Sequence, residues 1–209
     1  PDKNTSPLEY YSVEYSVPVE LVEILLQDYD SETVDRILGS SYEMRQTSIR
    51  VNTDRISVDE VERKLEAAGI ETVRGSLNDT SLLIKGYDYV RRIPGFMDGE
   101  FVVQDQSSCL AVRAAGIQNG DLVVDVCAAP GGKTMYAASL AGQTGRVISR
   151  DLTENKTELI EENVDRLGLT NVTVEAWDAR DLDENLVGKA DVVIADLPCS
   201  GLGIMGRKN

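Results

Sequence analysis

The residues with the clearest capacity for chemistry lie in one stretch, Leu122–Thr134, with the sequence LVVDVCAAPGGKT. Its apolar start, rich in β-branched residues, predicts a buried strand, and the paired glycines predict a tight turn before a helix over 133–141. Gly131 and Gly132 let the backbone approach a ligand closely, and the first N–H groups of a helix suit a polar or anionic group. The stretch therefore predicts a cradle for a nucleotide-type ligand.

Two kinds of ligand compete for this cradle. A phosphate-binding P-loop has the form GxxxxGK[ST]; Gly132–Thr134 supplies its second half, but Cys127 stands where the first glycine belongs. The other candidate is a cofactor that contains a ribose. The run Arg146–Asp151 predicts a second strand, which ends in a carboxylate twenty residues after Gly131. In doubly wound folds such a carboxylate binds ribose hydroxyls, which favours the second candidate over an ordinary turn.

Further motifs accompany the cradle. DVCAAPGGKT at 125–134 is followed by DAR at 178–180 and by DLPCSGLG at 196–203, and VQDQSS at 103–108 precedes it. From about residue 45 to its end, the chain resembles the Sun/RsmB-type family of S-adenosylmethionine-dependent RNA (cytosine-5) methyltransferases. The two long motifs carry the resemblance. It implies a class I, Rossmann-like methyltransferase domain with S-adenosyl-L-methionine as its cofactor.

The resemblance also implies a reaction. A cysteine thiolate adds to carbon-6 of cytosine, carbon-5 takes the methyl group from the sulfonium, and loss of the carbon-5 proton ejects the thiolate. A paired cytosine hides both carbons in the stack, so the expected substrate is single-stranded or opened RNA with the base turned out. Small-subunit ribosomal RNA is the expected target, and transfer RNA is the close alternative.

Site roles follow from the same resemblance. Asp151 is expected on the ribose hydroxyls, Asp178 on the adenine amino group, and Asp196 beside the methionine end and the incoming base. Lys133 would either orient that base or cap the loop, and Asp125 is expected to be a structural strand residue. The loop expected around the methionine and ribose consists of Cys127, Ala128, Ala129, Pro130, Gly131, Gly132 and Lys133.

Cys199 completes the expected catalytic set with Asp196 and Lys133. In the family, the cysteine of the Pro-Cys motif assists product release, and the nucleophile belongs to a Thr-Cys motif further downstream. No Thr-Cys pair occurs here, so we expect the nucleophile to lie beyond Asn209 and the fragment alone to be inactive or weak. A small buried residue is the alternative role for Cys199. Two positions depart from the family pattern, Arg150 beside Asp151 and Leu197 after Asp196.

Composition limits the other possibilities. Three cysteines without a CxxC spacing, and no histidine, predict neither a zinc site nor a disulfide framework. No run of about 18 apolar residues and no basic-then-apolar leader is present, which predicts a cytoplasmic protein without a membrane span.

Charge is the main argument against an RNA substrate. The formal net charge is −15, from 36 acidic and 21 basic residues, which is the wrong sign for gripping phosphates. Basic residues nevertheless cluster at Arg45 and Arg50, at Arg91 and Arg92, and at 207–208. We therefore expect a locally basic cleft on an acidic body.

The elements before the cradle predict two smaller parts. Residues 1–46 form a linker and helical lead-in, in which 1–17 are extended without a core and two helices follow Pro18. Residues 47–98 form a small α+β module of ferredoxin or RNA-recognition type, with strands at 48–52, 71–74 and 81–84 and a helix opened by the capping box Ser57/Glu60. Its strands lack stacking aromatics, so a scaffold role is as plausible as RNA binding.

Residues 99–209 are predicted to hold the partial methyltransferase domain, after a boundary at 93–99. A strand at 100–103 opens it, and a helix over 106–115 turns Leu110, Ala111 and Ala114 to the core. Repeated strand and helix signals, with a helix at 154–167 and strands at 172–176 and 191–195, predict a doubly wound parallel sheet of order 3-2-1-4. Three further strands of a complete class I fold are absent.

Two rival functions remain at this point. A non-catalytic module that binds RNA or a protein through the same fold would lack cofactor binding. An enzyme of nucleoside triphosphates would show magnesium-dependent nucleotide binding, although Asp151 would repel phosphate.

Overall fold

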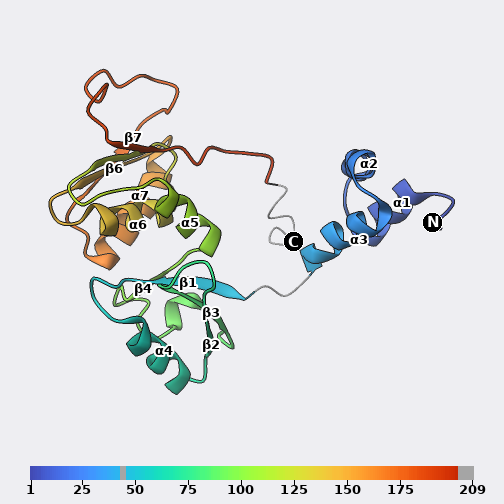
Figure 1. Ribbon diagram of the computed structural model, residues 1–209, viewed down its shortest axis with the longest axis horizontal. Coiled ribbons are helices and arrows are strands. Elements are labelled where there is room, and N and C mark those ends of the chain that lie inside the picture. The colour runs from blue at the N-terminus through green and yellow to red at the C-terminus, as the bar shows by residue number, and fades with distance from the viewer. Residues whose placement is uncertain (43–45, 202–209) are drawn as a thin grey trace. The chain divides into compact units, whose positions relative to one another are not determined.

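The structure is a computed structural model that describes residues 1–42 and 46–201 (Figure 1). The chain divides into two compact units, one of residues 1–45 and 199–209 and the other of residues 46–198. In the described residues, no helix combines the length and apolar character needed to cross a bilayer. Nor do these residues contain a group of three or more His, Cys, Asp or Glu side chains that could hold a metal ion.

The lead-in is helical from nearly its first residue. It contains α1 (Pro7–Glu14), α2 (Val19–Asp28), α3 (Ser31–Gly39) and the short η1 (Ser40–Tyr42). Tyr11, Val22, Val34 and Leu38 are fully buried together. The expectation that residues 1–17 are extended and coreless is therefore wrong. Pro7 suits the first position of a helix, and Tyr11 anchors α1 because its hydroxyl donates to Ser31 O at 2.9 Å.

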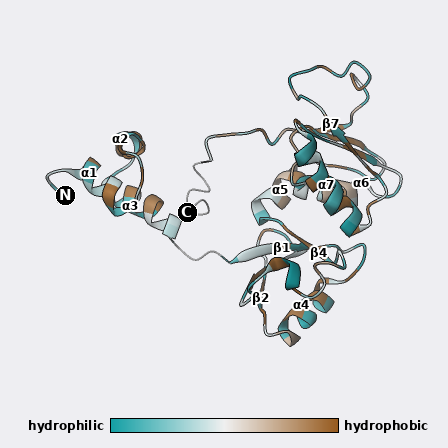
Figure 2. Ribbon diagram, turned by 180° about the vertical axis from the view of Figure 1, so that it is seen from behind, coloured by the Kyte–Doolittle hydropathy of each residue, from teal (hydrophilic) through white to brown (hydrophobic). Residues whose placement is uncertain are grey.

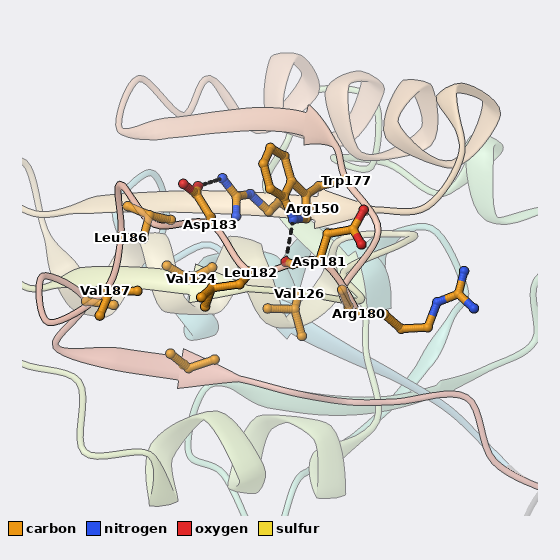
Figure 3. Close-up of a pocket in the computed structure, with 13 residues that line it drawn as sticks. Val124, Val126, Arg150, Trp177, Arg180, Asp181, Leu182, Asp183, Leu186 and Val187 are labelled. Atoms are coloured by element: carbon orange, nitrogen blue, oxygen red, sulfur yellow. Dashed lines mark hydrogen bonds and ion pairs between the residues drawn. The ribbon is translucent and has the colours of Figure 1, made fainter.

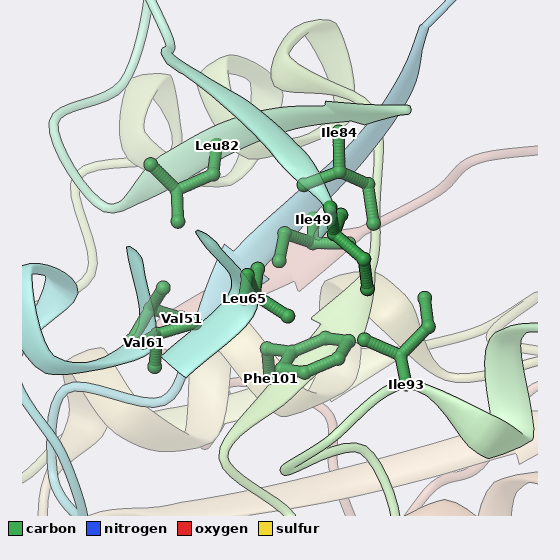
Figure 4. Close-up of a cluster of buried hydrophobic side chains, with 9 residues drawn as sticks. Ile49, Val51, Val61, Leu65, Leu82, Ile84, Ile93 and Phe101 are labelled. Atoms are coloured by element: carbon green, nitrogen blue, oxygen red, sulfur yellow. The ribbon is translucent and has the colours of Figure 1, made fainter. Parts of the chain in front are cut away.

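The small α+β module has the expected order of elements. Its elements are β1 (Thr47–Val51), α4 (Val58–Ala67), β2 (Glu71–Arg74), β3 (Ser81–Lys85), η2 (Val90–Arg92) and β4 (Phe101–Val103). The strands form an antiparallel sheet of order β2-β3-β1-β4. The capping box is present, since the Ser57 and Glu60 side chains each bond the other's backbone N–H. Leu65 of α4 and Ile49 of β1 meet in the buried core beside Phe101 (Figure 4).

The strand expected to open the methyltransferase part belongs to the smaller sheet. β4 pairs with β1, with Phe101 opposite Val51 and Val103 opposite Ile49. Phe101 is fully buried in the core of the small module. Its neighbour Val102 packs instead in the buried cluster that contains Met135 and Ile160, which lie in the two helices after the cradle strand and the next strand. Side chains alternate across a strand, so β4 contributes to both cores. A boundary at residue 99 therefore misassigns this strand.

The parallel sheet has the predicted topology. Its strands are β5 (Leu122–Asp125), β6 (Arg146–Asp151), β7 (Val172–Ala176) and β8 (Val192–Ile194), and its helices are α5 (Gln106–Ala114), α6 (Gly132–Ala141) and α7 (Glu154–Leu167). The order β7-β6-β5-β8, with every pair parallel, confirms the expected 3-2-1-4 arrangement. α7 combines a charged outer face with an apolar stripe that includes Ile160, so hydrophilic and hydrophobic residues both occur along its ribbon (Figure 2).

The buried face of α5 differs from the prediction. Cys109 and Val112 are buried against Tyr136 and Ala137 of the cradle helix, whereas Leu110 is 47% exposed. Ala111 and Ala114, expected inside with Leu110, are exposed as well. A short helix with apolar residues on adjacent faces does not fix its own rotation, and packing against α6 decides it.

Candidate cofactor-binding and active site

The cradle loop joins β5 to α6 at the carboxyl edge of the parallel sheet. Gly131 has φ +101°, and a Cβ there would lie 2.4 Å from Met135 Cε, so this position requires glycine. Gly132 has no such restriction, because the nearest atom to a Cβ there is 3.6 Å away. No described side chain makes a capping hydrogen bond at the start of α6, so its first N–H groups have no side-chain cap. These groups are placed to bind an anionic end of a ligand.

Asp151 is bonded directly into this loop. Its Oδ2 accepts a hydrogen bond from Ala129 N at 3.0 Å, and its Oδ1 accepts from Leu152 N at 2.8 Å and from Lys156 Nζ at 2.9 Å. Burial alone would raise the pKa of this carboxyl, but these bonds, led by the one from Lys156, hold the pKa below its usual value. The structure thus brings together the predicted loop and the predicted ribose carboxylate, which is ionised.

Lys156 is a partner that the sequence analysis missed. It lies in the first turn of α7, which begins at Glu154 three residues after β6 ends. The short connection and the helical turn bring the ammonium group back to the strand end. A basic residue five positions after a strand-ending acid is the signal that could have identified it.

Asp125 lies beneath the loop in a buried polar network. Thr134 Oγ1 is 2.8 Å from Asp125 Oδ2 and 2.8 Å from Ser149 Oγ, which links β5, α6 and β6. Burial raises the pKa of Asp125 to about 6, although Thr134 and the charge of Lys133 act against the rise. Asp125 is fully buried, in keeping with a structural role. Neither Thr134 nor Ser149 was singled out for this network from the sequence.

Lys133 and Asp196, two of the predicted catalytic residues, form an ion pair. Lys133 Nζ donates to Asp196 Oδ2 at 2.5 Å, with the lysine side chain 19% and the aspartate side chain 60% exposed. α6 supplies the lysine, and the segment after β8 supplies the aspartate. The pair therefore joins the cradle to the DLPC motif and remains open to solvent on the aspartate side.

Asp178 follows the end of β7, next to the Asp151 strand. Trp177 N donates to Asp151 O at 2.9 Å, so Asp178 is the following residue at the same sheet edge. Its carboxylate is bound by the Arg180 guanidinium at 2.5 to 3.1 Å, and these bonds lower the pKa of Asp178 to about 2. The role of Asp178 in binding adenine stays a prediction. An adenine amino group that bonds to this carboxylate would have to displace Arg180.

Arg150 lies on the opposite side of β6 from Asp151. Its Nε donates to Glu175 Oε2 at 2.9 Å, its Nη2 donates to Asp183 Oδ2 at 2.5 Å, and its guanidinium lies 4.4 Å from the centre of the Trp177 ring (Figure 3). Successive side chains of a strand alternate, so Arg150 points away from the side of β6 that carries Asp151, the predicted ribose ligand. Arg150 instead fastens the connection after β7 over a cavity of about 360 Å³ that is lined by Val124, Leu186 and Val193, among others.

The three cysteines differ in their surroundings. Cys109 is buried, Cys127 is half-buried, and Cys199 is exposed, and all three are free thiols. Burial, followed by the charges of Asp151 and Asp125, raises the pKa of Cys127, which therefore stays a thiol at neutral pH. Cys109 therefore packs in the core, whereas Cys127 lies half-buried in the cradle loop. Cys199 follows Asp196 by three residues in the chain, and its predicted role stays a prediction.

The structure describes only some residues of the expected basic cleft. Arg45 and residues 207 and 208 lie outside the described residues, as do residues 202 and 203 at the end of the DLPCSGLG motif. Arg50 is not a surface residue: it is 3% exposed, donates to Gln104 Oε1 at 2.9 Å and lies 4.6 Å from the centre of the Tyr136 ring. Arg91 reaches Glu162 at 3.6 Å.

Two family models match the chain. The model described as 16S rRNA methyltransferase RsmB/F matches residues 113–209, and the model described as an RsmF/B-like ferredoxin-like domain matches residues 17–90. The second match begins before residue 47, the predicted start of the small module, and includes the helices α2 and α3.

Named relatives and a solved structure agree with these matches. The probable ribosomal RNA small subunit methyltransferase B of Bacillus subtilis is 35% identical over 99% of this chain and 46% of its own length. The tRNA (cytosine(72)-C(5))-methyltransferase of Pyrococcus horikoshii is 34% identical over 64% of this chain and 34% of its own. The crystal structure of PH0851 superposes with a TM-score of 0.87 at 32% identity, covering 96% of this chain and 45% of the other. The chain thus spans less than half the length of these relatives.

Proposed function

The chain belongs to the RsmB/F family of ribosomal RNA methyltransferases, as its motifs indicate, and we propose that it binds S-adenosylmethionine for methylation of carbon-5 of a cytosine in small-subunit ribosomal RNA. The observation that carries the proposal is the hydrogen bond from Ala129 N to Asp151 Oδ2. It joins the glycine loop to an ionised carboxylate at the edge where open α/β sheets bind their ligands.

The donors and acceptors at this edge fit the cofactor. The first N–H groups of α6 suit its carboxylate, and Asp151 would accept its ribose hydroxyls. Leu152 and Leu197, which directly follow Asp151 and Asp196, are 58% and 56% exposed and offer apolar surface to the adenine ring. Asp178 would accept the adenine amino group once Arg180 moves aside. When bound, the cofactor would supply the methyl group.

The catalytic roles rest on the residues beside the cradle. Asp196 would face the target base and the methionine end, with Lys133 orienting its carboxylate through their ion pair. Cys199, the cysteine of the Pro-Cys pair three residues after Asp196 in the chain, would assist release of the product from a cysteine-linked covalent intermediate. Ribosomal RNA as substrate would place the protein in the cytoplasm.

Calorimetric titration of the chain with S-adenosylmethionine, and in parallel with magnesium–ATP, tests the cofactor. We expect saturable binding of S-adenosylmethionine alone, weakened about tenfold or more by Asp151→Ala, because a charge-assisted bond to a ligand contributes about 1.5 to 3 kcal/mol. Glu158→Ala, which removes an exposed acid from α7, is the matched control and should bind as the wild type does. Binding of magnesium–ATP, or no binding of S-adenosylmethionine, would contradict the proposal.

Transfer RNA is the alternative substrate, favoured by the similarity to the Pyrococcus enzyme named for cytosine 72 of tRNA. Transfer of tritiated methyl groups by a chain extended past Asn209, where the nucleophile is expected, separates the two when small-subunit ribosomal RNA and bulk tRNA are compared at equal concentration. Preferential labelling of tRNA would overturn the ribosomal assignment and leave the reaction type unchanged.

A further inference from the structure

A separate cavity of about 280 Å³ lies on the small α+β module. The end of α4 forms one wall with Ala68 and Ile70, and the segment 86–89 after β3 forms another. Arg92, the last residue of the short η2 helix, closes the cavity together with Ile93 and Pro94. None of these residues belongs to the cradle, the Asp151 bonds or the Lys133–Asp196 pair, so the function proposed above leaves this cavity unused.

Two tyrosines line the cavity and differ in how firmly they are held. The Tyr87 hydroxyl is hydrogen-bonded to Thr47 Oγ1, and its ring packs on the buried core of the module. Tyr89 is 68% exposed, so one face of a large flat ring is open to a ligand. The strands of this module lack stacking aromatics, but the segment directly after β3 supplies them. Aromatic rings that border a pocket are the usual platforms for unpaired bases.

Arg92 gives the cavity an uncommitted positive charge. Among the lysines and arginines that the structure describes, only Arg92 and Lys189 have a side chain without a hydrogen bond or ion pair. The other described basic side chains are held within the protein, as when Arg74 bonds both Asp59 and Glu62. Asp88, also in the cavity wall, has an unpaired carboxylate. The cavity thus combines a free donor, a free acceptor and an open ring.

We propose that this cavity binds an unpaired nucleobase of the RNA substrate. Tyr89 stacks on the base, Arg92 holds the neighbouring phosphate, and Asp88 accepts a hydrogen bond from an exocyclic amino group, as carboxylates do from cytosine. The inference rests on the proposed RNA substrate and adds a second contact point for it, on a module apart from the cofactor cradle. It also accounts for RNA binding by an acidic chain, because stacking does not require a large positive surface.

Fluorescence anisotropy with a labelled single-stranded cytidine oligonucleotide tests the proposal. Tyr89→Ala and Arg92→Ala should each weaken binding by about tenfold. Two variants serve as matched controls: Tyr29→Ala removes an exposed tyrosine from the end of α2, and Lys189→Ala removes the other unpaired cation. Both controls should bind as the wild type does. Equal binding by Tyr89→Ala and the wild type, or no binding by the wild type, would overturn the proposal.

A second oligonucleotide distinguishes the base from the backbone. On an abasic strand of the same length, Tyr89→Ala should have no effect, whereas Arg92→Ala should still weaken binding because the phosphates remain. If Tyr89→Ala weakens binding to both strands equally, the ring does not stack on a base and the proposal fails. The affinity for S-adenosylmethionine should be the same in both variants as in the wild type. A wild type that does not bind S-adenosylmethionine would count against the proposed function and not against this pocket.

Discussion

Asp151 and Asp125 end neighbouring strands, yet their carboxyl groups shift in opposite directions. Asp151 accepts three hydrogen bonds, one of them from the ammonium of Lys156, and its pKa is lowered. Asp125 accepts one bond from the Thr134 hydroxyl in a fully buried position, and its pKa rises to about 6. Partners, rather than depth alone, decide the sign of each shift. Asp151 therefore stays charged well below neutral pH, whereas the midpoint of Asp125 lies at about pH 6.

Stability should consequently depend on Asp125 between about pH 4 and pH 6.5. A carboxyl whose folded pKa is raised contributes stability in its protonated form, and this contribution is lost as the pH rises through about 6. A rise from 3.8 to about 6 corresponds to about 3 kcal/mol. In Asp125→Asn the amide oxygen can still accept from Thr134, so the variant should lack this loss. Urea unfolding at pH 5 and pH 7.5 measures it.

The comparison is between the two proteins at each pH, because the many other carboxylates titrate equally in both. Wild type and Asp125→Asn should differ more at pH 7.5 than at pH 5, with the variant the more stable at the higher pH. A constant difference across this range would show that Asp125 is ionised throughout.

Gly131 and Gly132 should respond differently to alanine. Gly131→Ala requires a positive φ and places a Cβ against Met135, so we expect a loss of about 2 kcal/mol in unfolding free energy. Gly132→Ala lies at the start of a helix, where the new Cβ would make only ordinary van der Waals contact with Gln104, so it should be neutral or stabilising by up to about 1 kcal/mol. If the cofactor approaches the Gly132 backbone closely, the added methyl group of Gly132→Ala should weaken S-adenosylmethionine binding several-fold without destabilising the fold. Urea unfolding measures the stability of both variants, and calorimetric titration measures their affinity for S-adenosylmethionine.

At the scale of elements, Arg150 joins three segments: β6, the end of β7 through Glu175, and the connection through Asp183. Its side chain is 7% exposed, so this pairing is largely shielded from solvent. The connection also carries Asp178, the residue predicted to bind adenine, so Arg150 is a positioning residue for it.

Replacing Arg150 by methionine should release this connection. We expect a loss of about 3 kcal/mol, because two acids lose their partner in a shielded place. Trp177 is the only tryptophan, so detachment should also shift its emission to longer wavelength. Arg146→Met is the matched control, since Arg146 lies on the same strand and bonds only Thr173 at 3.1 Å. Unchanged tryptophan emission in Arg150→Met would show that Arg150 does not hold the connection after β7 in place.

β4 shows how one element can belong to two cores. Phe101 enters the small module, and Val102 enters the cluster that contains Met135 of α6. Arg166 of α7 adds to this junction, since it donates to Phe96 O at 2.7 Å and to Phe101 O at 3.0 Å. The small module and the cradle helices are thus fastened together through backbone groups that no sequence pattern indicates.

At the scale of the whole molecule, charge is distributed by pairing. The chain carries 36 acidic against 21 basic residues, and nearly all of the described basic side chains are engaged within the protein. Under the proposed function, affinity for RNA would then depend on a few free groups and on stacking, not on a broad positive surface. The lead-in has a buried cluster of its own around Tyr11, and the remaining core clusters lie in residues 46–198.

The sequence by itself determined the strand–turn–helix cradle, the order of the parallel strands and the positions of α4 and α7. These features depend on residues that are close in the chain: apolar periodicity, glycines that permit a turn, and a capping box. The tertiary structure alone decided the sheet to which β4 belongs, the buried face of α5 and the core around Tyr11. It also decided that Lys156 reaches Asp151 and that Arg150 turns away from it. Periodicity shows which faces are apolar, but the partner that covers a face, or that bonds a buried charge, comes from distant parts of the chain.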